Sequence, residues 1–142
     1  MSYFAWASDM SVGNTLLDHD HQALIALVNE LHTATSRGEG REVVGDILDR
    51  LLVYTQQHFQ REEHHMEQVH YSKMVEHLRL HRDLYERVLE LKARFDSGHI
   101  TVAAQVSSLL RDWLSLHILR DDKQFAAEVT TASADAAQGA GG

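Results

Sequence analysis

The sequence contains no cysteine and no proline among its 142 residues. Without cysteine there is no disulfide and no thiolate metal ligand, although the redox compartment stays open. Without proline nothing forces a break in a helix, and the plentiful Ala, Leu, Glu, Arg and Gln favour helices, so the sequence predicts an all-α protein. The length is that of one domain, and the 44% hydrophobic content is enough for a globular core.

Other absences narrow the range of functions. The formal net charge of −8 leaves no broad basic surface for phosphate backbones, so nucleic-acid binding is disfavoured. The N-terminus lacks the positive start and long apolar core of a signal peptide, and no apolar run is long enough to cross a membrane. No Ser-His-Asp arrangement, glycine-rich phosphate loop or cysteine nucleophile supports hydrolytic, kinase-like or thiol chemistry. We therefore expect a soluble, cytoplasmic protein that does not bind membranes.

Apolar residues recur at three- and four-residue steps in four segments, which predicts four amphipathic helices. The predicted helices cover about 16–35, 41–66, 73–95 with Ser72 as the N-cap, and 101–129. Residues 1–15 show no helical period and predict an arm packed on the outside of the fold. Residues 130–142 are rich in Gly and Ala and predict a disordered, flexible tail. Short connections favour an antiparallel up-down-up-down four-helix bundle over residues 16–129.

Ionisable side chains interrupt the apolar stripe of every predicted helix. In chain order they are His21, His58 with Glu62, His77 with His81, and His117 followed by Asp121 and Asp122. Residues four apart share one face of a helix, so each pair can bind one ion or two neighbouring ions. One such pair arises easily by chance. Burying several imidazoles and a carboxylate without partners would cost roughly a few kcal/mol apiece, so the whole set predicts a metal site.

The types of ligand narrow the choice of metal. Imidazole suits zinc, copper, iron and nickel, whereas imidazole mixed with carboxylate and without thiolate suits iron or manganese. Two six-coordinate ions that share two carboxylates, one oxygen atom and five imidazoles would have about eleven of twelve positions filled. A small molecule such as dioxygen could bind at the position left open.

The last acidic ligand is ambiguous from geometry alone. On an ideal helix Asp121 lies about 40° from His117, whereas Asp122 lies about 140° away. Geometry therefore prefers Asp121. A local π-type widening or a bend at the end of this helix would instead rotate Asp122 inward.

Several stretches together resemble the bacterial hemerythrins, from about residue 4 to residue 126. They are DHDH at 18–21 with Leu24, NEL at 29–31, HFQREE at 58–63 with Met66, HLRLH at 77–81, and WLSLHI at 113–118 leading to Asp122. The resemblance implies a four-helix bundle around a non-haem di-iron centre, in which an oxo or hydroxo bridge joins two iron ions. It also implies reversible binding of dioxygen.

The resemblance further implies a role for each ligand. One iron would be held by three histidines and the other by two, with two carboxylates bridging them; in that order these are His77, His81 and His117, then His21 and His58, then Glu62 and Asp122. The two-histidine iron would have the open position. The spacing of the family's motif thus favours Asp122 over Asp121.

These features predict a protein for oxygen storage, delivery or sensing, with dioxygen as its ligand and its protein partners unknown. The alternative is an enzyme, a di-iron oxidase or peroxidase or a nitric-oxide-handling protein; a pure signalling module is a third interpretation. The excess of imidazole over carboxylate favours carriage, because oxygen-activating bundles generally use more carboxylates. A dry dioxygen pocket is predicted to be lined by Leu24, Phe59, Trp113, Leu114 and Ile118.

Two groups of residues fall outside this assignment. Asp20 stands where the family often has Gln, and we expect an exposed acid near the start of the helix. The alternative is that Asp20 lies behind the ligands, where its charge would alter ligand orientation or dioxygen stability. Six further histidines are predicted to lie at the surface or at helix ends: His19, His32, His64, His65, His70 and His99.

Overall fold

A computed structural model describes the backbone of residues 3–140 and the side chains of residues 3–131. Four long helices form the body of the molecule: α1 (Thr15–Ser36), α2 (Arg41–Gln68), α3 (Met74–Asp96) and α4 (Val102–Leu116). The chain then continues through a π-helix, η2 (His117–Asp122), into α5 (Lys123–Ala140). A short 3-10 helix, η1 (Ser8–Met10), precedes α1.

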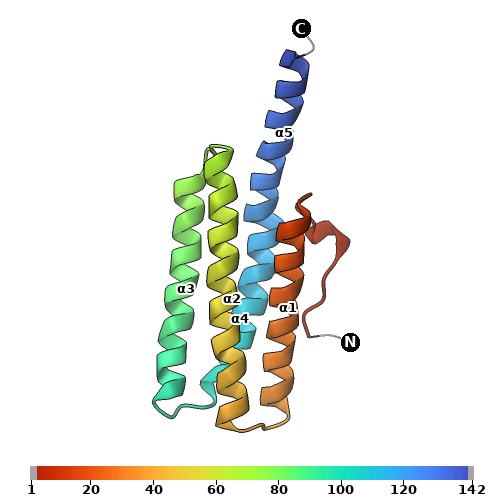
Figure 1. Ribbon diagram of the computed structural model, residues 1–142. Coiled ribbons are helices and arrows are strands. Elements are labelled where there is room, and N and C mark those ends of the chain that lie inside the picture. Colours follow the sequence, from red (N-terminus) through yellow and green to blue (C-terminus); the bar gives the residue numbers. More distant parts are fainter. Residues whose placement is uncertain (1–2, 141–142) are drawn as a thin grey trace.

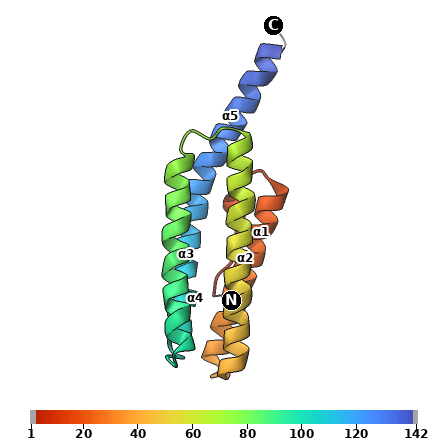
Figure 2. The same ribbon diagram turned by 60° about the vertical axis from the view of Figure 1, so that its left-hand side comes forward.

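The four long helices are arranged in a ring. The first helix, α1, packs against α2 and α4, and α3 packs against the same two neighbours. Successive helices run in opposite directions, and α5 extends beyond the end of the bundle (Figures 1 and 2). The predicted all-α, antiparallel four-helix bundle is therefore confirmed.

Local sequence explains where the helices begin and end. The side chain of Asn14 caps α1 by accepting a hydrogen bond from the backbone N–H of Leu17 at 3.1 Å. Gly38 and Gly98 follow α1 and α3 with φ angles of 68° and 114°. A β-carbon is disfavoured at such positive φ angles, so glycine at these two positions lets the chain turn into the next helix.

The apolar core is divided by a polar layer. The larger cluster is built from leucines, valines and other apolar side chains on all four helices, including Leu24, Leu48, Leu84 and Leu110. A smaller cluster fills the end of the bundle from which α5 emerges, and it consists of Val12, Leu17, Met66, Tyr71 and Phe125. On each helix the buried ionisable residues lie at the end of the larger cluster that faces the smaller one, so apolar layers close the polar layer from both sides.

The N-terminal arm is tied to α1. The backbone N–H of Phe4 donates to the side-chain oxygen of Asn29 at 2.8 Å, and the amide of Asn29 donates back to the Phe4 carbonyl at 2.7 Å. Asp18 accepts hydrogen bonds from the Ser11 hydroxyl and the Val12 N–H. The arm thus packs against the outside of the bundle and buries Phe4 in the larger cluster.

Two details differ from the sequence-based expectation. Lys73, not Ser72, is the N-cap of α3, because the N–H and hydroxyl of Ser72 donate instead to the carboxylate of Glu128 on α5. The fourth helix was expected to end near Val129 and give way to a disordered tail, whereas the backbone stays helical to Ala140. The tail contains several alanines and no proline, and alanine has the highest intrinsic helix propensity. Residues 141 and 142 lie outside the described part of the chain.

Within the described residues, none of the helices has a stretch both long enough and apolar enough to cross a membrane.

Candidate metal centre

Seven buried histidine and acidic side chains meet in the polar layer between the two apolar clusters. They come from α1, α2, α3 and η2, and in chain order they are His21, His58, Glu62, His77, His81, His117 and Asp122. Each is at most 3% exposed to solvent. The structure therefore brings together all the residues that the sequence proposed as ligands.

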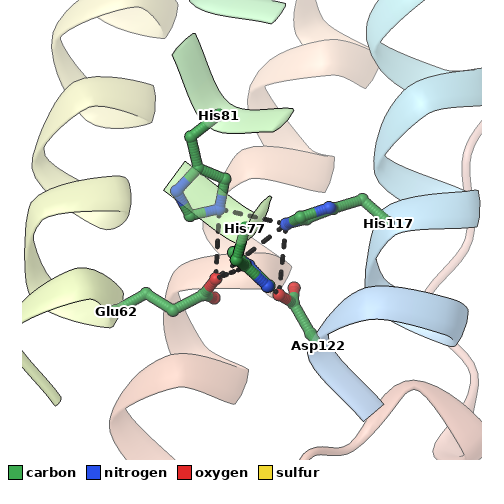
Figure 3. A group of neighbouring side chains, drawn as sticks. All are labelled: Glu62, His77, His81, His117 and Asp122. Carbon is green, nitrogen blue, oxygen red and sulfur yellow. Dashed lines mark hydrogen bonds and ion pairs between the residues drawn. The ribbon is translucent and has the colours of Figure 1, made fainter. Parts of the chain in front are cut away.

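The seven side chains form two groups in which the ligand atoms lie within 4.8 Å of one another. The three-histidine group contains His77, His81 and His117, which surround the carboxylates of Glu62 and Asp122 (Figure 3). The two-histidine group contains the remaining imidazoles, His21 and His58, with the same two carboxylates. Both acids are thus shared between the groups.

Each shared carboxylate turns one oxygen toward each group. Glu62 Oε1 lies 2.7 Å from His77 Nε2 and 3.1 Å from His81 Nε2, whereas its Oε2 lies 3.4 Å from His58 Nε2. Asp122 Oδ1 lies 3.1 Å from the Nε2 atoms of His77 and His117.

The second oxygen of Asp122 completes the pattern. Asp122 Oδ2 lies 3.2 Å from His21 Nε2. A carboxylate that presents one oxygen to each of two groups of imidazoles is suited to bridge two metal ions.

A π-helix resolves the ambiguity between the two neighbouring aspartates. In the segment η2 (His117–Asp122) the backbone hydrogen bonds span five residues instead of the four of an α-helix, which rotates Asp122 toward the bundle interior. Asp122 is 1% exposed and meets His117 from within the bundle. Asp121 instead approaches the same imidazole from outside, where its carboxylate lies 2.9 Å from His117 Nδ1.

Carboxylates support three of the five imidazoles through the ring nitrogen that points away from the centre. Besides the contact of Asp121 with His117, Glu63 lies 2.7 Å from His81 Nδ1 and Asp20 lies 3.0 Å from His58 Nδ1. Such partners fix the tautomer and orientation of a metal-binding histidine. Sequence reasoning did not assign this role to Glu63 or Asp121.

The expectation of an exposed Asp20 is wrong, because this side chain is only 2% exposed. The start of α1 faces α2, and Asp20 is buried against Tyr54, His58 and Arg61 of that helix. Burial alone would raise the pKa of Asp20, but hydrogen bonds from His58 and Arg61 outweigh it and hold the pKa well below its usual value. Asp20 is therefore an anion within the fold.

The charges of the centre also explain its protonation without metal. Burial lowers the pKa of His21, but the negative charges of the nearby Asp122 and Glu62 carboxylates outweigh this effect and raise the pKa to about 9. Burial raises the pKa of Glu62, but the surrounding imidazoles, His117 among them, hold it well below its usual value. The metal-free centre therefore attracts protons to its histidines, and binding of a metal ion must release them.

The donor set of this chain fits a pair of metal ions. Five buried atoms of the centre have no hydrogen-bond partner: both ring nitrogens of His21, Oε2 of Glu62, and both carboxylate oxygens of Asp122. Buried polar atoms are normally satisfied, and unsatisfied ones cost about 1–3 kcal/mol each. Four of these atoms face the shared interior of the two groups, where metal ions would satisfy them.

The five predicted lining residues all belong to or pack against the larger apolar cluster, and two of them also stack on ligands. Phe59 stacks on the ring of His81 with a centroid separation of 3.7 Å, and Trp113 stacks on His117 at 4.2 Å. Both aromatic rings thus support the three-histidine group. Leu24, Leu114 and Ile118 are buried in the larger apolar cluster.

The six remaining histidines are exposed or half-buried, as the sequence predicted. None of them belongs to a cluster of potential metal ligands in the described part of the chain.

Comparison with known proteins agrees with this geometry. The family described as "Hemerythrin HHE cation binding domain" matches residues 12–129. The chain belongs to the hemerythrin family. The resemblance identified from the sequence motifs is thereby confirmed.

Individual hemerythrins are similar over nearly the whole chain. The bacteriohemerythrin of Stenotrophomonas maltophilia (strain R551-3) is 33% identical over 129 residues, which cover 91% of this chain and 83% of the relative. That of Methylococcus capsulatus (strain ATCC 33009 / NCIMB 11132 / Bath) is 29% identical, and the match covers 88% and 95% of the two chains. A crystal structure of wild-type hemerythrin has a TM-score of 0.83 at 28% identity and covers 88% of this chain and 96% of that one.

Proposed function

We propose that the protein binds dioxygen reversibly at a non-haem di-iron centre and serves in oxygen storage, delivery or sensing rather than as an enzyme. The observation that carries this proposal is the shared pair of carboxylates, since Glu62 and Asp122 each belong to both groups of potential ligands. A single-metal site would need neither the sharing nor two separate sets of imidazoles.

The proposed centre assigns every buried donor. His77, His81 and His117 would bind one iron ion, and His21 and His58 the other. Glu62 and Asp122 would bridge the two ions through opposite oxygens. Imidazole mixed with carboxylate and without thiolate suits redox-active iron or manganese, and iron is proposed because the resemblance to hemerythrins implies a di-iron centre. The naming of the similar relatives as bacteriohemerythrins supports the same assignment.

Dioxygen is proposed to bind on the two-histidine side, because that group offers one imidazole fewer than its neighbour. A ferrous pair held by these residues would supply the two-electron redox chemistry that reversible dioxygen binding requires. The chain itself contributes orientation of the ligands and exclusion of water. The apolar side chains of Leu24, Leu114 and Ile118 are proposed to keep this side dry, so that bound dioxygen leaves again instead of being protonated and lost.

Iron analysis combined with an oxygenation cycle tests the proposal. Purified protein is expected to hold two iron ions per chain. Addition of dioxygen to the anaerobic ferrous protein should change the optical spectrum, and removal of dioxygen should restore it. Irreversible oxidation with turnover of a reductant or nitric oxide would instead support the alternative, a di-iron oxidase, peroxidase or nitric-oxide-handling enzyme.

A pair of variants localises the site of binding. His58→Ala removes a donor of the two-histidine group and is expected to abolish the reversible spectral change. Leu89→Ala alters a side chain that is 43% exposed and is expected to leave the cycle unchanged. Reversible oxygenation in the His58→Ala protein would refute the assignment of dioxygen to this half.

A further inference from the structure

Asp20 forms a buried charge cluster behind the two-histidine half of the centre. Its carboxylate accepts two hydrogen bonds from the guanidinium of Arg61, at 2.8 Å from Nε and 2.7 Å from Nη2. It accepts a third from the hydroxyl of Tyr54 at 3.0 Å. Two planar hydrogen bonds from arginine fix both the position and the rotation of a carboxylate. Asp20 is thus held rigidly between α1 and α2.

The fourth partner of Asp20 is a proposed metal ligand. Asp20 Oδ2 lies 3.0 Å from His58 Nδ1, while His58 Nε2 on the opposite side of the ring faces Glu62 Oε2. A carboxylate only accepts hydrogen bonds, so it keeps the proton of a neutral imidazole on Nδ1. The lone pair of His58 is then on Nε2, the nitrogen that points to the centre.

Support of this kind is unevenly distributed between the two halves. In the three-histidine group the supporting carboxylates of Glu63 and Asp121 have side chains that are 26% and 13% exposed. Asp121 is paired with its chain neighbour Arg120, whose side chain is 58% exposed. Asp20 is buried, and its arginine partner, Arg61, lies on another helix, α2. In the two-histidine group, His21 Nδ1 has no hydrogen-bond partner in the described structure. The orientation of that group therefore depends on His58 and on the anion behind it.

We propose that Asp20 is a positioning residue which, locked by Arg61 and Tyr54, orients His58 and strengthens metal binding selectively in the two-histidine half of the centre. This inference rests on the proposed function only in requiring that the chain bind two metal ions. A buried anion on the far nitrogen makes an imidazole a better donor, and loss of such a partner typically weakens metal binding about 10- to 100-fold.

Titration of the metal-free protein with Co²⁺ tests the inference, because the visible absorption of cobalt reports its ligands independently of oxygen binding. The wild-type chain is expected to bind two Co²⁺ ions. The absorption lost in His58→Ala identifies the ion of the two-histidine group. Asp20→Asn keeps the size of the side chain but removes its charge, and it is expected to weaken that ion about tenfold or more. The other ion should change less than twofold.

Glu63→Gln is the matched control, since it removes the equivalent anion behind His81. It is expected to give the opposite pattern, with weaker binding in the three-histidine group only. The double variant Asp20→Asn/Arg61→Gln removes any repulsion between the new amide and the guanidinium. It is expected to keep the weakened affinity, because His58 still lacks an anionic acceptor.

The outcomes separate this inference from the proposed function. If wild-type protein binds fewer than two Co²⁺ ions, the two-metal proposal itself fails. If it binds two but Asp20→Asn weakens neither ion, both alike, or only the three-histidine ion, the positioning role is overturned. Wild-type affinity in the double variant would also overturn it, because the defect would then come from Arg61 and not from the lost charge.

Discussion

Replacement of Asp122 by Asn is expected to damage both halves of the centre, whereas replacement of its neighbour Asp121 by Asn should weaken only one. The two residues are adjacent in the chain and chemically identical. The π-helix gives them different surroundings, with Asp122 inside the centre and Asp121 behind His117. The pair of variants therefore isolates the consequence of that local backbone geometry.

The contacts set the expected magnitudes. Asp121 meets a single ligand, His117, through its outer ring nitrogen, so its loss should weaken one ion about 10- to 100-fold, or about 1.4–2.8 kcal/mol. Asp122 faces His77 and His117 through one oxygen and His21 through the other. Its loss removes a direct ligand from each proposed ion, and the effect on each should exceed about hundredfold.

Iron retention measures this difference. Each variant is loaded with Fe²⁺ anaerobically and dialysed against chelators of increasing affinity, and iron per chain is determined after each step. Circular dichroism checks that both variants keep the helical content of the wild type. The reasoning is refuted if Asp121→Asn loses iron as readily as Asp122→Asn, or if Asp122→Asn retains two ions under conditions that strip neither from the wild type.

Three further predictions concern stability and the lining of the centre. The side chain of Leu114 is 2% exposed, and Leu114→Ala would leave a cavity in its place. Urea unfolding of the metal-free protein should show that the free energy of unfolding falls by about 2–5 kcal/mol. The oxygenated form should also autoxidise faster, and an unchanged lifetime of that form would argue against the lining role. The pKa of His21 is about 9 in the folded protein and 6.5 in the unfolded chain. The protonated imidazole therefore adds to the free energy of unfolding in full below pH 6.5, and this contribution is lost as the pH rises through 9. Urea unfolding of the metal-free protein should show this fall, and a flat profile from pH 6.5 to 9 would contradict it. Gly45 lies within α2, and Gly45→Ala would place a β-carbon at 3.4 Å, an ordinary contact distance, from the ring of Phe95. Because alanine favours a helix more than glycine does, the free energy of unfolding should rise by up to about 1 kcal/mol, and a lower melting temperature would contradict this prediction.

The sequence predicted the helices well because their signal is local. The apolar stripe of α1 and the breakers around Gly38 fix its two ends within the chain itself, and the predicted span of 16–35 differs by one residue at each end. The buried ionisable residues stand out in the same way, since an imidazole such as His77 interrupts an otherwise apolar face.

Contacts between helices were much harder to predict. The burial of Asp20 depends on Arg61 and Tyr54, which lie more than thirty residues away and meet it only when α1 packs on α2. The sequence alone therefore favoured the ordinary role of an acid near a helix start, and that prediction was wrong. Glu63 was missed for the same reason, because its partner His81 is on the next helix.

The choice between Asp121 and Asp122 shows which features can be predicted from the sequence and which depend on the folded backbone. Periodicity determined that an acid near the end of the fourth helix faces His117, and it could do so because side-chain directions follow from a regular backbone. In the π-helix η2 the backbone is irregular, so side-chain directions no longer follow the spacing of an α-helix. Phe125, eight residues after His117, packs against Tyr71 at a centroid separation of 4.8 Å, and the extra residue in η2 lets Phe125 and Asp122 both point inward.

By itself, then, the sequence determined four amphipathic helices and the types of ligand that they bury, since both are properties of residue order along one helix. Only the tertiary structure decided which carboxylates bridge the two groups and which stand behind the imidazoles. The physical reason is that a bridging oxygen is defined by distances to several helices at once, and those distances exist only after the helices have packed.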